Sequence, residues 1–135
     1  MTISMSKNQI EKEALQVLTC WVHAFTKADV EAIVELYAYD ASFIGTGSKS
    51  IVTKPAGIRT YFEMALLGDR KFVASFTDVC ATVLSESVVV VAALDKLVMT
   101  TKGETKTHFG RVSFVITQHE SNWKISHFHR SEMPA

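Results

Sequence analysis

Two arginines near the end of the chain, Arg111 and Arg130, are the residues whose type and position most clearly suggest chemistry. They belong to two alternating runs, Thr107–Gln118 and Trp123–Arg130, which are rich in β-branched and aromatic residues and are separated by the polar residues 119–122. If the residues flanking this turn pair in an antiparallel hairpin, Arg111 falls directly opposite Arg130. Opposed like charges repel, so we expect the arginines to lie at a solvated edge, to have an acidic neighbour or to receive an anionic ligand.

The same register divides the hairpin into two faces. One face has a polar and aromatic set, namely Arg111, Ser113, Val115, Ser126, Phe128 and Arg130. The other has Val112, Phe114, Ile116, Trp123, Ile125, His127 and His129. No carboxylate with the spacing of a metal ligand accompanies the two histidines. We therefore interpret them as neutral, hydrogen-bonded residues of a core or a subunit interface, and predict neither a metal nor a cofactor.

A catalytic alternative requires a carboxylate or histidine base inside a cavity. The sequence offers four candidates, which are Asp40, Asp95, His127 and His129. No aspartate and histidine stand at a spacing typical of a catalytic pair. The sequence therefore favours a non-catalytic role over an isomerase or a cyclase, without excluding either enzyme.

Helices are predicted ahead of the hairpin. Apolar residues recur every three or four positions over Lys7–Lys27, and Trp21 lies on this stripe, so it should face the core. Asp29 is a suitable cap for a second helix, Val30–Tyr37, with Tyr37 on its buried face.

A third helix is predicted to open at Thr53-Lys54-Pro55, with Thr53 as its cap and the proline in its first turn, and to end at Gly68. A short strand, Ala41–Ile44, should precede it. The stretch Gly-Thr-Gly-Ser-Lys at 45–49 is interpreted as a plain turn, because its spacing differs from that of a phosphate-binding loop.

From Lys71 the apolar pattern alternates, which predicts strands over Lys71–Leu84, bulged near Asp78, and over Val88–Met99, followed by the hairpin. Short turns between consecutive strands indicate an antiparallel meander. We expect an α+β fold in which helices cover one face of a strongly curved sheet and leave a ligand cavity between them. The outer face, with the valines of 88–91 and the row of Phe114 and Ile116, is expected to form a homodimer interface.

Composition limits the remaining possibilities. The 135 residues suit a single domain, 1–135, and 47% hydrophobic and 21% charged residues indicate a folded chain. A net charge of +0 argues against nucleic-acid or acidic-membrane partners. Cys20 and Cys80 are far apart and are expected to be buried, reduced thiols. Residues 1–6 lack the features of a signal peptide, so a cytoplasmic location is expected.

The tail Trp123–Pro134, which reads WKISHFHRSEMP, resembles the C-terminal signature of the calcium/calmodulin-dependent protein kinase II association (hub) domain, W-x-x-x-H-F-H-R-S-x-x-P. The residues Ile58–Glu63 resemble a helix of the same domains, and Arg111 matches the arginine of their penultimate strand. The resemblance extends from about Lys7 to Pro134. It implies the cone-shaped nuclear transport factor 2-like fold, shared with SnoaL-like cyclases, ketosteroid isomerase and bacterial SgcJ/EcaC-like proteins.

In the association domains, the arginines that match Arg111 and Arg130 line a pocket for small carboxylates. The resemblance therefore implies a non-catalytic, oligomeric module that binds a small organic acid or another oxyanion. The expected lining also includes Ser113, Phe128, Trp21 and Tyr37. Asp95 falls near a third pocket arginine of these domains, and it can instead neutralise the pair. A structural assembly domain without a ligand is a further alternative.

Overall fold

The computed structural model describes residues 5–135, so residues 1–4, part of the stretch in which no signal peptide was expected, lie outside it. In chain order, the elements are α1 (Lys7–Thr26), α2 (Val30–Glu35), β1 (Tyr37–Ile44), β2 (Val52–Thr53), α3 (Lys54–Ala65), β3 (Lys71–Ser85), β4 (Val88–Thr101), β5 (Glu104–His119) and β6 (Asn122–Glu132). The predicted α+β class is confirmed.

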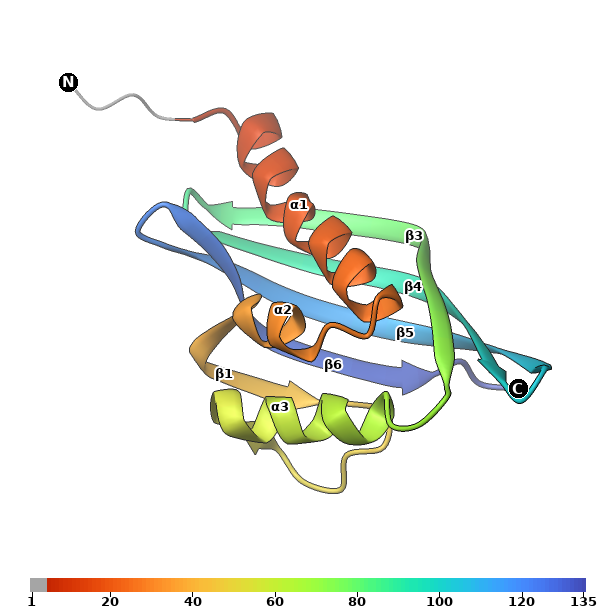
Figure 1. Ribbon diagram of the computed structural model, residues 1–135. Coiled ribbons are helices and arrows are strands. Elements are labelled where there is room, and N and C mark those ends of the chain that lie inside the picture. The colour runs from red at the N-terminus through yellow and green to blue at the C-terminus, as the bar shows by residue number, and fades with distance from the viewer. Residues whose placement is uncertain (1–4) are drawn as a thin grey trace.

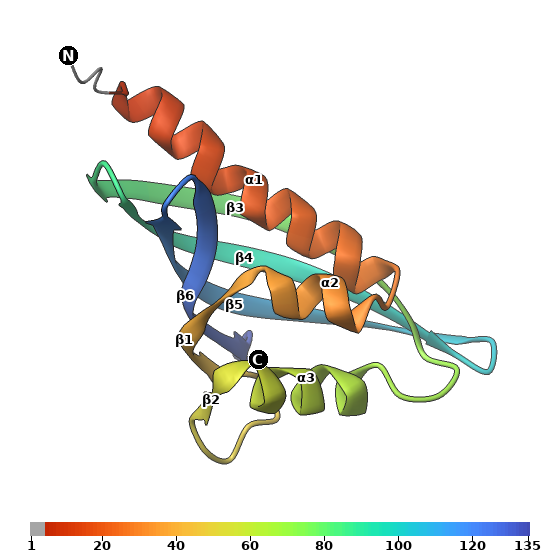
Figure 2. The same cartoon turned by 60° about the vertical axis from the view of Figure 1, so that its left-hand side comes forward.

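The strands form one curved sheet in the order β2-β1-β6-β5-β4-β3, and the three helices cover one of its faces (Figures 1 and 2). β3 to β6 form the predicted antiparallel meander. β1 departs from this pattern because it pairs in parallel with β6, the last strand of the chain. This pairing brings the loop after β1 to the C-terminal end of β6.

The second and third helices begin at the predicted capping residues, Asp29 and Thr53, and the Asp29 side chain accepts a hydrogen bond from the backbone N–H of Ala32 at 3.1 Å. Ser6, which was not predicted as a cap, caps α1. The apolar stripe of α1 faces the sheet, and Trp21 is only 4% exposed, as predicted. α1 lies along β3, whereas α3 covers β1 and β2 (Figure 2).

Two predicted helix ends are wrong. The second helix stops at Glu35, and Tyr37 is the first residue of β1, although its side chain is buried as expected. The third helix ends at Ala65, before Gly68. Gly68 adopts φ 81°, a conformation that favours glycine, in the connection to β3.

β-Bulges shift the pairing register within β3 and within β6. In β3 the pairing shifts between Phe76 and Asp78, which confirms the predicted irregularity near Asp78. A shift in β6, between Ile125 and His127, was not predicted. Ile125 pairs with Ile116, but His127 pairs with Val115, so Ser126 is an extra residue.

The β6 bulge reverses the faces of the residues that follow it, since side chains alternate along a strand. Phe128 and Arg130 point into the core with Val112, Phe114 and Ile116, whereas His127 and His129 lie on the outer face. The predicted opposition of Arg111 and Arg130 is therefore wrong. Arg111 pairs with Ser131, and Arg130 pairs with Val112.

Burial also corrects the surface predictions. Val89, Val91, Phe114 and Ile116 are 0% exposed within the single chain, so they cannot supply an interface between copies. Their strand neighbours Val88, Val90 and Val115 are only partly buried and lie on the outer face. Cys20 and Cys80 are both exposed, contrary to the expectation of buried thiols. Among residues 5–135, no helix is long and apolar enough to cross a membrane.

Candidate ligand cavity

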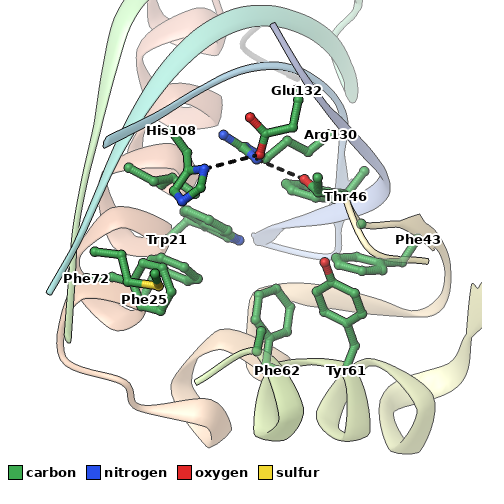
Figure 3. Close-up of a pocket in the computed structure, with 15 residues that line it drawn as sticks. Trp21, Phe25, Phe43, Thr46, Tyr61, Phe62, Phe72, His108, Arg130 and Glu132 are labelled. Atoms are coloured by element: carbon green, nitrogen blue, oxygen red, sulfur yellow. Dashed lines mark hydrogen bonds and ion pairs between the residues drawn. The ribbon is translucent and has the colours of Figure 1, made fainter. Parts of the chain in front are cut away.

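A cavity of about 200 Å³ lies between the helices and the covered face of the sheet (Figure 3). Most of its wall is aromatic, from Trp21, Phe25, Phe43, Tyr61, Phe62, Phe72 and Phe128, and aliphatic groups come from Ala65, Leu97 and Met99. The aromatic residues belong to α1, β1, α3, β3 and β6, so the complete fold is needed to assemble the wall.

Stacked rings fix the shape of the apolar wall. The Trp21 ring stacks on Phe25 with ring centroids 4.8 Å apart, and Phe43 stacks on Phe128 at 4.9 Å. The indole N–H of Trp21 donates to the Tyr37 hydroxyl at 3.1 Å. This bond satisfies the polar atom of a buried indole and holds the ring in one orientation.

A buried ion pair lies at one end of the cavity. Arg130 Nε and Nη2 each donate to an Asp95 carboxylate oxygen at 2.7 Å, and the two side chains are 7% and 5% exposed. Asp95 pairs with Gly110 in the neighbouring strand. A Cβ atom at Gly110 would overlap the Arg130 guanidinium, so this glycine leaves the space through which the arginine reaches Asp95.

The other side-chain contacts of Arg130, to Thr46 and Glu132, form the partly exposed rim of the cavity. Arg130 Nη1 donates to Thr46 Oγ1 at 2.8 Å and makes a longer contact of 3.5 Å to Glu132 Oε1. The same Glu132 oxygen lies 3.8 Å from His108 Nδ1. Figure 3 shows these side chains gathered at one end, with Trp21 and the other rings beyond them. We call Thr46, His108, Arg130 and Glu132 the polar end.

The ion pair keeps Arg130 charged. Burial alone lowers the pKa of Arg130, but its hydrogen bonds to Asp95 and the negative charges of Asp95 and Glu132 act in the opposite direction, and the net effect raises it. Arg130 is therefore a permanent cation whose charge is already balanced inside the protein.

Comparison with known proteins places this geometry in a family. Residues 14–135 match the sequence profile of the SnoaL-like domain. The chain belongs to this family. No match is found among curated proteins.

Solved structures related to this SnoaL-like domain share its fold. A Xanthomonas campestris protein named for the calcium/calmodulin-dependent protein kinase II association domain is 26% identical, with a TM-score of 0.82 over 91% of this chain and 87% of the other. A candidate dehydratase of the nuclear transport factor 2-like family from Streptomyces avermitilis is 14% identical, with a TM-score of 0.86 over 95% and 99%. A ketosteroid isomerase-like protein from Erwinia carotovora atroseptica is 13% identical, with a TM-score of 0.79 over 95% and 99%. The predicted resemblance is thus confirmed.

The structure of this SnoaL-like domain brings only some of the predicted site residues together. Trp21, Phe128 and Arg130 line the cavity, and Asp95 lies behind Arg130. Tyr37 lies behind the wall, where it contacts Trp21. Arg111 and Ser113 are on the outer face instead, along a shallow groove that also includes His129 and Ser131, and Arg111 Nε donates to Ser131 Oγ at 3.2 Å. A two-arginine carboxylate pocket is therefore not formed.

The four proposed bases do not provide a free base in the cavity. Asp95 is held by Arg130, and Asp40 and His129 are exposed away from the cavity wall. His127 Nδ1 lies 2.8 Å from Ser42 Oγ on the outer face. Within residues 5–135, no three His, Cys, Asp or Glu side chains are grouped closely enough to hold a metal ion.

Several cavity residues were missed by the sequence analysis. Thr46 was assigned to a plain turn, yet its hydroxyl accepts from Arg130. His108 and Glu132 follow from the alternation of their strands once Arg130 is known to face inward. Gly45 signals the close approach of α3, because a Cβ atom there would overlap the Tyr61 ring.

Proposed function

We propose that this SnoaL-like domain is a binding module for a small, mainly apolar ring compound that carries one polar group. The observation that supports this proposal is the aromatic cavity with its single polar end. Apolar cavities of about 150 Å³ are large enough to bind benzene, so a cavity of about 200 Å³ can hold one substituted ring. The polar group of the ligand would lie against Thr46, His108, Arg130 or Glu132.

This proposal retains the non-catalytic binding role expected from the sequence but changes the ligand. A small organic acid was expected because two arginines were thought to share the pocket. Arg130 now has Asp95 as its partner, and Arg111 lies elsewhere. The hydrophobic wall, rather than a pair of cations, supplies most of the binding free energy in the revised proposal.

The test compares two substitutions in the same helix. Ala65 lines the cavity near the end of α3, whereas Ala56 is exposed near its beginning. Ala65→Phe should fill the cavity and abolish binding of small aromatic alcohols and ketones, measured by ligand-observed NMR. Ala56→Phe should bind them like the wild type. The proposal fails if the wild type binds no member of the panel at millimolar concentration, or if Ala65→Phe binds equally well.

A second candidate function is acid–base catalysis by the polar end. His108 and Glu132 are 3.8 Å apart, with side chains 40% and 48% exposed beside the cavity. A histidine beside a carboxylate can transfer a proton near neutral pH, as an isomerisation or a dehydration requires. If the domain turns over a bound ring compound, His108→Gln should abolish turnover and retain binding. His119→Gln, at the exposed end of β5 and away from the cavity, should leave both unchanged.

A further inference from the structure

We propose that the polar end selects a cation, so that the preferred ligand is a small ring compound with a protonated amine. This inference rests on the proposed function and specifies its ligand class. It reverses the charge expected from the two-arginine hypothesis.

Arg130 has few donors left for a ligand. A guanidinium has five N–H groups. Nε and Nη2 donate to Asp95, while Nη1 donates to Thr46 and contacts Glu132. The remaining Nη2 hydrogen belongs to the part of the guanidinium that lies against Gly110. A carboxylate ligand therefore cannot form the two-pronged contact that makes arginine an effective anion site.

Glu132, in contrast, has acceptors to spare. Its two contacts are long, 3.5 Å to Arg130 and 3.8 Å to His108, and both use the same oxygen, Oε1. An ionised carboxylate offers about four lone-pair sites. Its side chain is 48% exposed at the cavity rim, so a ligand can reach it. An ammonium group supplies the hydrogen-bond donors that this carboxylate lacks.

The charges and the rings favour the same ligand. The single positive charge of Arg130 faces the two negative charges of Asp95 and Glu132, so these three side chains together carry one net negative charge. The aromatic wall adds to the effect, because the faces of aromatic rings attract cations. An anion would meet repulsion from Glu132.

The experiment uses three ligands of nearly equal size: benzylamine, benzyl alcohol and benzoate. Calorimetric titration of the wild type at neutral pH should show benzylamine binding about tenfold or more tightly than benzoate, as expected for one charge-assisted hydrogen bond. Glu132→Gln should remove most of this preference and leave benzyl alcohol unchanged. Glu120→Gln, in the exposed β5–β6 turn, is the matched control and should behave like the wild type.

A second variant tests whether the N–H donors of Arg130 are already occupied, and it leaves the ion pair with Asp95 in place. Thr46→Val removes the acceptor of Arg130 Nη1, so it should free one donor and strengthen benzoate binding several-fold. If benzyl alcohol binds but benzoate binds as tightly as benzylamine, the cation inference is wrong and the proposed function stands. If no ligand binds, both are wrong. An amine preference that persists in Glu132→Gln also overturns the inference.

Discussion

Arg130 and Asp95 form a pair whose two members depend on each other. Arg130→Ala would leave the Asp95 carboxylate buried without its partner, so we expect a loss of about 3–5 kcal/mol in the free energy of unfolding. Urea titration measures this loss. Arg111 is exposed on the outer face, so Arg111→Ala should lower the free energy of unfolding by less than about 0.5 kcal/mol. Equal losses in the two variants would contradict the assigned roles.

Tyr37 should make the fold sensitive to alkali. Burial raises the pKa of its hydroxyl well above the ordinary value, and the hydrogen bond from Trp21 offsets only part of that rise. The unfolded chain therefore loses this proton first, from about pH 10. The contribution is complete below that pH, and above it the free energy of unfolding should fall by about 1.4 kcal/mol per pH unit.

Replacement by phenylalanine tests this alkaline effect. Above about pH 10, the free energy of unfolding of Tyr37→Phe should fall less steeply with pH than that of the wild type. The difference in slope should be about 1.4 kcal/mol per pH unit, which urea titration at several pH values measures. Tyr39→Phe is the control, because Tyr39 is 76% exposed and its ionisation needs no unfolding. The same slope in Tyr37→Phe and in the wild type would show that Tyr37 does not titrate with unfolding.

Among the elements, the bulge at Ser126 decides which face of β6 enters the core. Deleting Ser126 would join Ile125 directly to His127, and plain alternation would then keep Phe128 and Arg130 facing the core, so we expect the deletion variant to fold cooperatively. Ser126→Ala keeps the extra residue and should fold, losing only the hydrogen bond to Thr117. Near-ultraviolet circular dichroism and thermal melting measure the tertiary packing and the stability of both variants. A deletion variant that does not melt cooperatively would contradict the assignment of Ser126 as the extra residue.

The same bulge marks the limit of sequence-based prediction. Periodicity predicted the helices, the meander and the burial of Trp21, because these depend on local patterns. The position of Arg130 depends on one unpaired residue, which alternation alone does not reveal. Because the predicted register placed Arg130 opposite Arg111, it did not indicate that Glu132 and His108 lie beside Arg130 at the cavity. Thr46 was equally hidden, since only the parallel pairing of β1 with β6 brings its loop to the arginine.

For the whole molecule, the outer sheet face is where self-association should occur. Val88, Val90 and Val115 lie there and are only partly buried in the single chain. We predict a homodimer through this face at micromolar concentration, with about 2,000 Å² or more buried in total. Val90→Lys should shift the molecular mass measured by light scattering toward the monomer. Met64→Lys, on the exposed surface of the helix α3 on the other side of the sheet, should leave the mass unchanged. A monomeric wild type would rule out the dimer.

The register shift within β3 should limit aggregation through this edge of the sheet. β3 ends the sheet, and its free row of backbone N–H and C=O groups could template the addition of strands from other molecules. The shift between Phe76 and Asp78 interrupts this row and alters its local twist. A second molecule therefore cannot hydrogen-bond in register along the full strand, so the native protein should resist conversion to fibrils even though an edge strand of 15 residues is exposed.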